Sequence, residues 1–115
     1  MICHRGDVVL VLFPDSNLRT AKRRPALVVQ ADQLGAGLPQ TIVAMITSNM
    51  ARAGHPSRVT VKFGSKSAKR AGLLTDSVIM TDNLATVHYV EVDRIIGSLP
   101  DLTEVNAALR MTLGL

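Results

Sequence analysis

Residues 22–30 read KRRPALVVQ, so a run of three cations passes into an apolar stretch through a single proline. Proline has no backbone N–H and a fixed φ, which suits the first residue of a β-strand better than its middle. Pro25 also favours an extended backbone at Arg24. The pattern therefore predicts a strand over residues 26–30 that begins beside Arg24 and holds this cation in a fixed direction.

Apolar runs on both sides of this stretch predict a protein built mainly of strands. Residues 8–13 and 41–47 are apolar almost throughout, which is typical of strands buried on both faces. Residues 58–62 alternate between polar and apolar, which indicates a strand with one face in water. Further short strands are expected over residues 77–80, 87–92 and 94–97.

One helix is expected after these strands. Pro100 breaks the chain, and Asp101 stands three residues before Glu104, as in a variant of the capping box that starts a helix. Residues 64–72 are expected to form a basic connection without regular structure. Short strands followed by one helix favour a small β-barrel or a strongly bent sheet, and no linker or repeat indicates a second domain within residues 1–115.

The composition narrows the function classes. The chain has 115 residues and a net charge of +4 at pH 7, with many cations gathered in residues 19–24 and 52–70. Clustered cations favour a polyanionic partner such as nucleic acid, although a small surplus of Lys and Arg also occurs on ordinary solvated surfaces. Cys3 is the sole cysteine, and no secretory signal or membrane-spanning apolar run is visible. A cytoplasmic protein without a disulfide and without a membrane segment is therefore expected.

Arg24 and Thr47 are the leading candidates for a functional site. A guanidinium stays charged and grips a phosphate with two donors at once, and Arg24 stands directly before a rigid strand. Thr47 ends an apolar strand, where its hydroxyl is able to donate to a phosphate oxygen. The alternative for each is an ordinary surface role, as a solvated cation or as a strand-end hydroxyl bonded to its own turn.

Other polar residues are weaker candidates. Asp76, Ser77 and Asp82 stand near a later strand, where a carboxylate serves either in proton transfer or in a turn. His55 lies in a polar loop, where it either contacts RNA or is only solvated. No metal-ligand spacing, phosphate loop, nucleophile elbow or CxxC motif is present, so no metal or other cofactor is expected. Cleavage of RNA fits this limit, because the 2′-hydroxyl is an internal nucleophile.

Four blocks, in order along the chain, resemble the MazF/PemK family of toxins from prokaryotic toxin–antitoxin systems. They are residues 5–8 (RGDV), 22–29 (KRRPALVV), 44–49 (AMITSN) and 75–79 (TDSVI). The resemblance implies an SH3-like β-barrel with a C-terminal helix. It also implies a metal-independent, sequence-specific endoribonuclease that cuts single-stranded RNA, such as mRNA. The expected products carry a 2′,3′-cyclic phosphate and a 5′-hydroxyl.

The resemblance also implies roles for particular residues. Arg24 matches the catalytic arginine of the family, and Thr47 matches its partner threonine. Asp82 matches a catalytic Asp of some members, but Met80 stands where those members have an Arg, which puts more weight on Arg24. The residues expected to contact RNA are Arg19, Lys22, Arg23, Ser48, Asn49, His55, Asp76 and Ser77.

The partners that the resemblance implies are single-stranded RNA, a second copy of the chain and a cognate antitoxin. An acidic, partly disordered segment of the antitoxin is expected to cover the basic loops, and DNA is expected to be reached only through an antitoxin complex. One alternative is a non-catalytic toxin that poisons DNA gyrase, although that family carries a Trp in its tail and this chain has none. The other alternative is a nucleic-acid-binding relative without activity.

Overall fold

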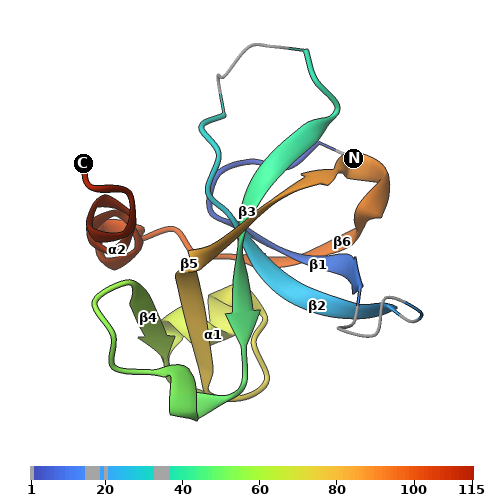
Figure 1. The fold of residues 1–115 in the computed structure, drawn as a ribbon. Helices are drawn as coiled ribbons and strands as arrows, with labels where there is room; N and C mark the ends of the chain where they lie inside the picture. Colours follow the sequence, from blue (N-terminus) through green and yellow to red (C-terminus); the bar gives the residue numbers. More distant parts are fainter. Residues whose placement is uncertain (1, 15–18, 20, 33–36) are drawn as a thin grey trace.

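The computed structural model describes residues 2–14, 19, 21–32 and 37–115. In this part of the chain, six strands form one antiparallel sheet in the order β4-β5-β3-β2-β1-β6 (Figure 1). The strands are β1 (Asp7–Pro14), β2 (Ala21–Val28), β3 (Gln40–Thr47), β4 (Arg58–Val61), β5 (Ser77–His88) and β6 (Val92–Ser98). The helices are α1 (Lys66–Ala71) and α2 (Thr103–Leu113), and the short 3-10 turns are η1 (Met50–Arg52) and η2 (Tyr89–Glu91).

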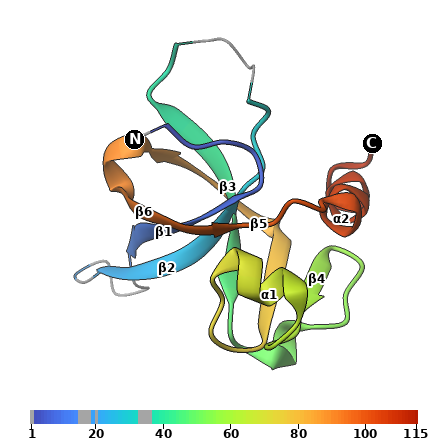
Figure 2. The same ribbon diagram turned by 180° about the vertical axis from the view of Figure 1, so that it is seen from behind.

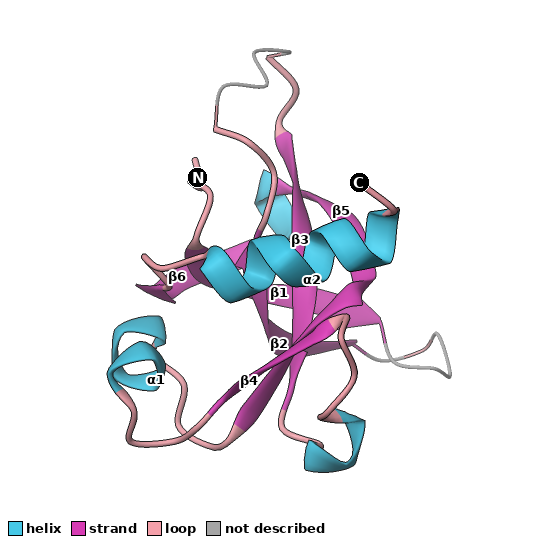
Figure 3. Ribbon diagram, turned by 90° about the vertical axis from the view of Figure 1, so that its left-hand side faces the viewer, coloured by secondary structure: helices cyan, strands magenta, loops and turns pink. Residues whose placement is uncertain are grey.

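The expected class, mainly β with a C-terminal helix, is confirmed, but the sheet is not a closed barrel. β4 and β6 are its two edges, and no pairing joins them in the described part of the chain. Register shifts between Ala44 and Met45 and along β1 mark irregular points, which bend strands and increase twist. Of the two helices, α1 contacts the edge strand β6, and α2 contacts both β5 and the edge strand β4. Figure 3 shows α2 lying across the strands.

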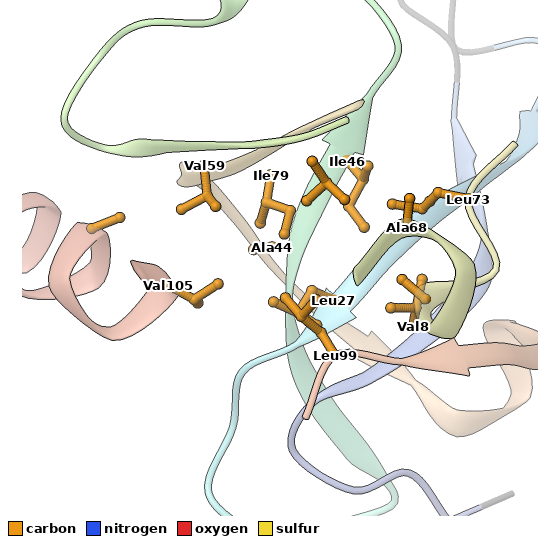
Figure 4. Close-up of a cluster of buried hydrophobic side chains, with 13 residues drawn as sticks. Val8, Leu27, Ala44, Ile46, Val59, Ala68, Leu73, Ile79, Leu99 and Val105 are labelled. Carbon is orange, nitrogen blue, oxygen red and sulfur yellow. The ribbon is translucent and has the colours of Figure 1, made fainter. Parts of the chain in front are cut away.

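The two faces of the sheet bury two separate hydrophobic clusters. Successive residues of β1 enter different clusters, since Val8 belongs to the one and Val9 to the other. The first cluster joins the sheet to α1 through Ala68 and to α2 through Val105, as Figure 4 shows. This alternation explains why strands buried on both faces read as continuous apolar runs.

The strands expected over residues 8–13, 41–47, 58–62 and 94–97 are confirmed, but β2 begins at Ala21 and not at Ala26. The separate strands expected over residues 77–80 and 87–92 are wrong: one continuous strand, β5, runs over Ser77–His88 and is followed by η2. Pro25 lies inside β2, where it pairs with Leu10 of β1. The pairing of β2 with β3 starts only at Ala26, so the strand has a single sheet neighbour at Pro25. A proline is tolerated there because an edge position needs no ladder bond from its missing N–H. The cations of residues 22–24 therefore belong to the strand itself.

The sequence analysis missed α1, which lies inside the stretch expected to be a basic connection. The Ser65 hydroxyl accepts the Ala68 N–H at the start of α1, and Gly72 ends the helix with a left-handed backbone at φ 72°. A serine cap followed by a glycine just past the last turn is a sufficient signal for such a helix. α2 is confirmed, but the expected capping box is wrong, because Leu102 is the N-cap and makes no side-chain cap bond. The Asp101 carboxylate instead accepts the Thr103 N–H. No described helix combines the length and the apolar character that crossing a membrane requires.

Candidate functional site

A pocket of about 360 Å³ lies where β2 and β3 part. The pairing of these strands stops at Ala26 and Met45, and the residues just beyond that point on both strands line the pocket. The connection between α1 and β5 forms a further wall; Figure 2 shows this part of the fold from behind. The described lining residues are Leu10, Lys22, Arg23, Arg24, Pro25, Ile46, Thr47, Ser48, Gly72, Leu73, Leu74, Thr75, Ser77 and Ile96.

The strand register explains why Arg24 and Thr47 meet at this pocket. Ala26 pairs with Met45, and Val28 pairs with Val43. The pairing ends at Ala26 and Met45, and Arg24 and Thr47, each two residues beyond that end on its own strand, both line the pocket. The two leading candidates, 23 residues apart in the chain, therefore face the same hollow.

A hydrogen bond from the next turn holds Thr47. The backbone N–H of Asn49 donates to Thr47 Oγ1 at 3.1 Å, which uses a lone pair of the oxygen, and among the described residues none accepts the hydroxyl proton. The side chain of Asn49 is itself engaged, since Asn49 Oδ1 accepts the Ala51 N–H at the start of η1. The turn after β3 therefore fixes the position of the Thr47 oxygen at the pocket.

The pocket is cationic along its β2 side. Lys22, Arg23 and Arg24 line it, and none of its described lining residues is acidic. Arg23 also pairs with Asp93 of β6, with 3.3 Å between Arg23 Nε and Asp93 Oδ1. Positive charge beside hydroxyl donors, at the end of a rigid sheet, is an arrangement that binds a phosphate.

Asp82 does not line this pocket. Its carboxylate is bound by Arg58 of β4, through Nη2 to Oδ2 at 2.9 Å and Nε to Oδ1 at 3.3 Å. Because the Arg58 guanidinium donates to it, the pKa of Asp82 lies below its ordinary value of 3.8. Arg58 pairs with Met80 across the two strands, so a guanidinium on β4 stands beside the position that carries Arg in some family members. The sequence analysis did not single out Arg58, because only the register of β4 and β5 shows that Arg58 lies beside Met80.

The remaining predicted contacts divide between the pocket and other places. Ser48 and Ser77 line the pocket with Lys22 and Arg23. His55 lies elsewhere and bonds Ser57, with 2.6 Å between its Nδ1 and Ser57 Oγ. The other three predicted contacts, Arg19, Asn49 and Asp76, are also absent from the described lining.

Asp76 joins the two ends of the connection between β4 and β5, which contains α1. Its Oδ1 accepts the Phe63 N–H at 2.8 Å, and its Oδ2 lies 3.7 Å from Lys62 Nζ. These contacts agree with the turn role that the sequence analysis gave as the alternative. Among the described residues, no three His, Cys, Asp or Glu side chains gather in a way that is able to hold a metal ion.

Comparisons with known proteins identify the family. A family model described as a PemK-like, MazF-like toxin of type II toxin-antitoxin systems matches residues 4–113. This chain belongs to the PemK/MazF toxin family. Endoribonuclease MazF6 of Mycobacterium tuberculosis is 34% identical over 119 aligned positions that cover all of both chains. Endoribonuclease EndoA of Bacillus subtilis is also 34% identical, with all of this chain and 97% of that protein covered.

The fold of this PemK/MazF chain also matches solved structures. A mycobacterial endoribonuclease in complex with its cognate antitoxin superposes with a TM-score of 0.75, covering 99% of this chain and 97% of the other. The two sequences are 23% identical, so this likeness concerns the fold. The bent, open sheet with its C-terminal helix is therefore a fold found among solved endoribonucleases.

Proposed function

We propose that this chain is the toxin of a type II toxin–antitoxin system and a metal-independent endoribonuclease that cuts single-stranded RNA at specific sequences. Its site is the pocket between β2 and β3. The observation that carries this proposal is the meeting of Arg24 and Thr47 at a cationic pocket, in a chain of the PemK/MazF family. The endoribonuclease names of the 34% identical relatives support the same activity.

The proposed reaction is an attack by the RNA on its own backbone. The 2′-oxygen adjacent to the scissile phosphate forms a bond to phosphorus, and the bond from phosphorus to the 5′-oxygen of the next nucleotide breaks. The 2′-hydroxyl loses its proton and the departing 5′-oxygen gains one. The products are a 2′,3′-cyclic phosphate and a 5′-hydroxyl, so atoms and charge balance without a covalent enzyme intermediate.

Arg24 and Thr47 stabilise the phosphate as negative charge accumulates on its oxygens. Arg24 supplies two donors to the non-bridging oxygens, and Thr47 supplies the proton that its bond from Asn49 leaves available. Lys22 and Arg23 bind the neighbouring backbone phosphates. The described lining contains no carboxylate or imidazole, so we assign the rate acceleration to charge stabilisation and the two proton transfers to water.

We also propose that residues 1–115 act as one cytoplasmic toxin domain that forms a homodimer and is neutralised by an antitoxin. The solved complex of a structural neighbour with its cognate antitoxin supports such a partner. An acidic, partly disordered segment suits the cationic edge of β2, because it competes with RNA for the same charges. Contact with DNA is proposed only through that complex.

The test is cleavage of a long single-stranded RNA in the presence of EDTA, with both new ends mapped. We expect discrete cuts that leave 5′-hydroxyl and 2′,3′-cyclic phosphate ends. Intact RNA would contradict the proposed activity, and stalled complexes in a separate assay with DNA gyrase, its DNA and no EDTA would show a gyrase toxin instead. A requirement for added divalent metal would contradict the proposed mechanism.

A further inference from the structure

The helix α1 carries cations on the face that points away from the core. Lys66, Lys69 and Arg70 are exposed, whereas Ala68 and Ala71 pack into the first hydrophobic cluster. Residues three and four positions apart lie side by side on a helix, so the three cations form one patch, which we call the α1 patch. Figure 2 shows α1 on the side of the fold that this view faces.

No acid of the described chain balances the α1 patch. None of its three cations forms an ion pair with a described residue, whereas the nearby Lys62 lies beside Asp76. The sequence itself has no Asp or Glu at any position from 33 to 75. Like charges three and four residues apart destabilise a helix, so the patch has a cost that a bound polyanion would offset.

The fold holds this short helix in a fixed place. A helix of six residues does not form alone in water, so its position depends on what it packs against. A Cβ added at Gly72 would lie 2.3 Å from the Ile96 carbonyl oxygen, and one added at Gly97 would lie 2.3 Å from the Arg70 carbonyl oxygen. No side chain fits at these distances, so glycine at both positions allows the end of α1 to approach β6 this closely. The α1 patch therefore stands on a rigid support.

An exposed aromatic ring precedes the helix. Phe63 is 63% exposed, although the burial of a phenyl ring is favourable. Its backbone is held on both sides, because the Phe63 N–H donates to Asp76 Oδ1 at 2.8 Å and the Ser65 N–H and hydroxyl both donate to the Lys62 carbonyl. Proteins hold single-stranded nucleic acid with this combination: cations follow the phosphates, and a base stacks on the ring. An acidic peptide would satisfy the cations but has no base to stack.

The α1 patch adjoins the pocket that contains Arg24. α1 ends at Ala71, and the residues that follow it, 72–74, line that pocket. Phe63 lies beyond the other end of the helix, which is about 9 Å long at a rise of 1.5 Å per residue. A strand of RNA that leaves the pocket over this wall therefore reaches the α1 patch first and Phe63 next.

We propose that the α1 patch and Phe63 bind a single-stranded flank of the RNA outside the pocket where it is cut. The inference rests on the proposed function and adds a second contact surface for the same substrate. Phosphates of the flank lie against the three cations, and one unpaired base stacks on Phe63. Stacking and phosphate contacts tolerate any sequence, so this surface strengthens binding without choosing the cut. Long RNAs are then better substrates than fragments that only fill the pocket.

The experiment compares two RNAs that share the mapped cut of the wild-type protein. The short RNA holds only the nucleotides next to the cut, and the long RNA adds an unpaired flank on each side. The triple variant Lys66→Gln, Lys69→Gln, Arg70→Gln removes the charges and keeps good helix formers. We expect it to raise KM for the long RNA roughly tenfold, with kcat and the short-RNA KM unchanged. With long 2′-O-methyl RNA, the slope of log K against log salt should fall by about 2, since each contact contributes about 0.7.

Phe63 is tested with a conservative pair of changes. Phe63→Tyr keeps a flat ring and is expected to bind the long RNA as the wild type does. Phe63→Leu keeps an apolar side chain without a ring, so KM for the long RNA is expected to rise about fivefold, the loss of one stacked base. As the charge control for Arg70→Gln, Arg110→Gln removes an exposed cation from the last turn of α2 and should change no constant. Thermal unfolding shows whether each variant folds.

The outcomes separate this inference from the proposed function. Equal KM values of the wild type for the two RNAs, or a triple variant with the wild-type KM and salt slope, would overturn the inference while cleavage stands. A triple variant that loses binding of poly-glutamate but keeps that of the long RNA would assign the patch to an acidic protein segment and also overturn it. If the wild type neither cuts the long RNA nor binds its 2′-O-methyl form, the proposed function fails too. Support for both is an Arg24→Ala variant that does not cut but binds the long 2′-O-methyl RNA, with that binding weakened by the triple change.

Discussion

Two arginines on the same sheet have different described neighbours. Arg24 on β2 lines a pocket with two further cations and with hydroxyls, and no acid is present among the described lining residues. Arg58 on β4 is bound by the Asp82 carboxylate through two hydrogen bonds and also donates to the Arg52 carbonyl at 3.0 Å. The first region gathers three cations at one hollow. The second places one arginine against one carboxylate.

The comparison shows that the role of a charged residue depends on its neighbours across the sheet. From the sequence, Asp82 was a candidate catalytic carboxylate, and Arg58 was not a candidate for any site. In the structure each is the partner of the other, and the ion pair lies outside the pocket. We therefore place the chemistry at Arg24 and Thr47 and give the Arg58–Asp82 pair a structural role. The following predictions test that division.

The largest expected effect is the loss of cleavage in Arg24→Ala. Removing a donor that stabilises charge in the transition state costs about 10²–10³-fold in rate, by analogy with the loss of an oxyanion donor. The measurement is the single-turnover rate of RNA cleavage, with thermal unfolding as the check on folding. Arg24→Lys is expected to recover only a small part of the rate, because an ammonium does not grip a phosphate with a planar pair of donors.

Thr47 is expected to have the next largest effect. Thr47→Ala removes one neutral donor, so the single-turnover rate is expected to fall by about tenfold, and Thr47→Ser is expected to keep most of it. The Ser variant retains the hydroxyl that accepts the Asn49 N–H, so it also controls for the turn after β3. Equal losses in both variants would point to packing of the methyl group and not to the hydroxyl.

A smaller effect is expected at Lys22, which lies on the exposed edge of β2. If Lys22 neutralises one phosphate, Lys22→Ala weakens RNA binding and reduces the slope of log K against log salt by about 0.7, the value for one contact to a single strand. The measurement is binding of a 2′-O-methyl RNA over a range of salt concentrations. An unchanged slope would remove Lys22 from the RNA-binding surface.

The smallest effects are expected at the Arg58–Asp82 pair. Asp82→Asn is expected to leave the cleavage rate within about twofold and to lower the free energy of unfolding by about 1 kcal/mol or less, since both side chains are partly exposed. Because the folded pKa of Asp82 lies below 3.8, the stability difference between wild type and Asp82→Asn should be present above about pH 5. It should shrink as the pH falls through the folded pKa. A large loss of cleavage in Asp82→Asn would return this residue to the catalytic site.

Much of the fold was predictable from local pattern, and the site only in part. The apolar run of β1 and the alternation of β4 each follow from which faces are buried, and the sequence carries that information. The sequence analysis placed the start of β2 too late, because it treated Pro25 as unable to lie inside a strand. A proline is excluded only where a strand is paired on both sides, and at Pro25 β2 pairs with β1 alone. Register and sheet order depend on contacts far apart in the chain. The family resemblance joined Arg24 to Thr47, and the structure adds that both line one pocket and that Arg58 binds Asp82.

The most direct test compares two arginine-to-alanine changes on the one sheet. Wild type, Arg24→Ala and Arg58→Ala are each incubated in EDTA with the same long single-stranded RNA, and the 5′-hydroxyl ends are mapped and timed. We predict that Arg58→Ala gives the wild-type cuts at close to the wild-type rate and that Arg24→Ala gives almost none. Cleavage by Arg24→Ala at the wild-type rate, with loss of cleavage in a folded Arg58→Ala, would contradict the assignment of the active site to the pocket between β2 and β3.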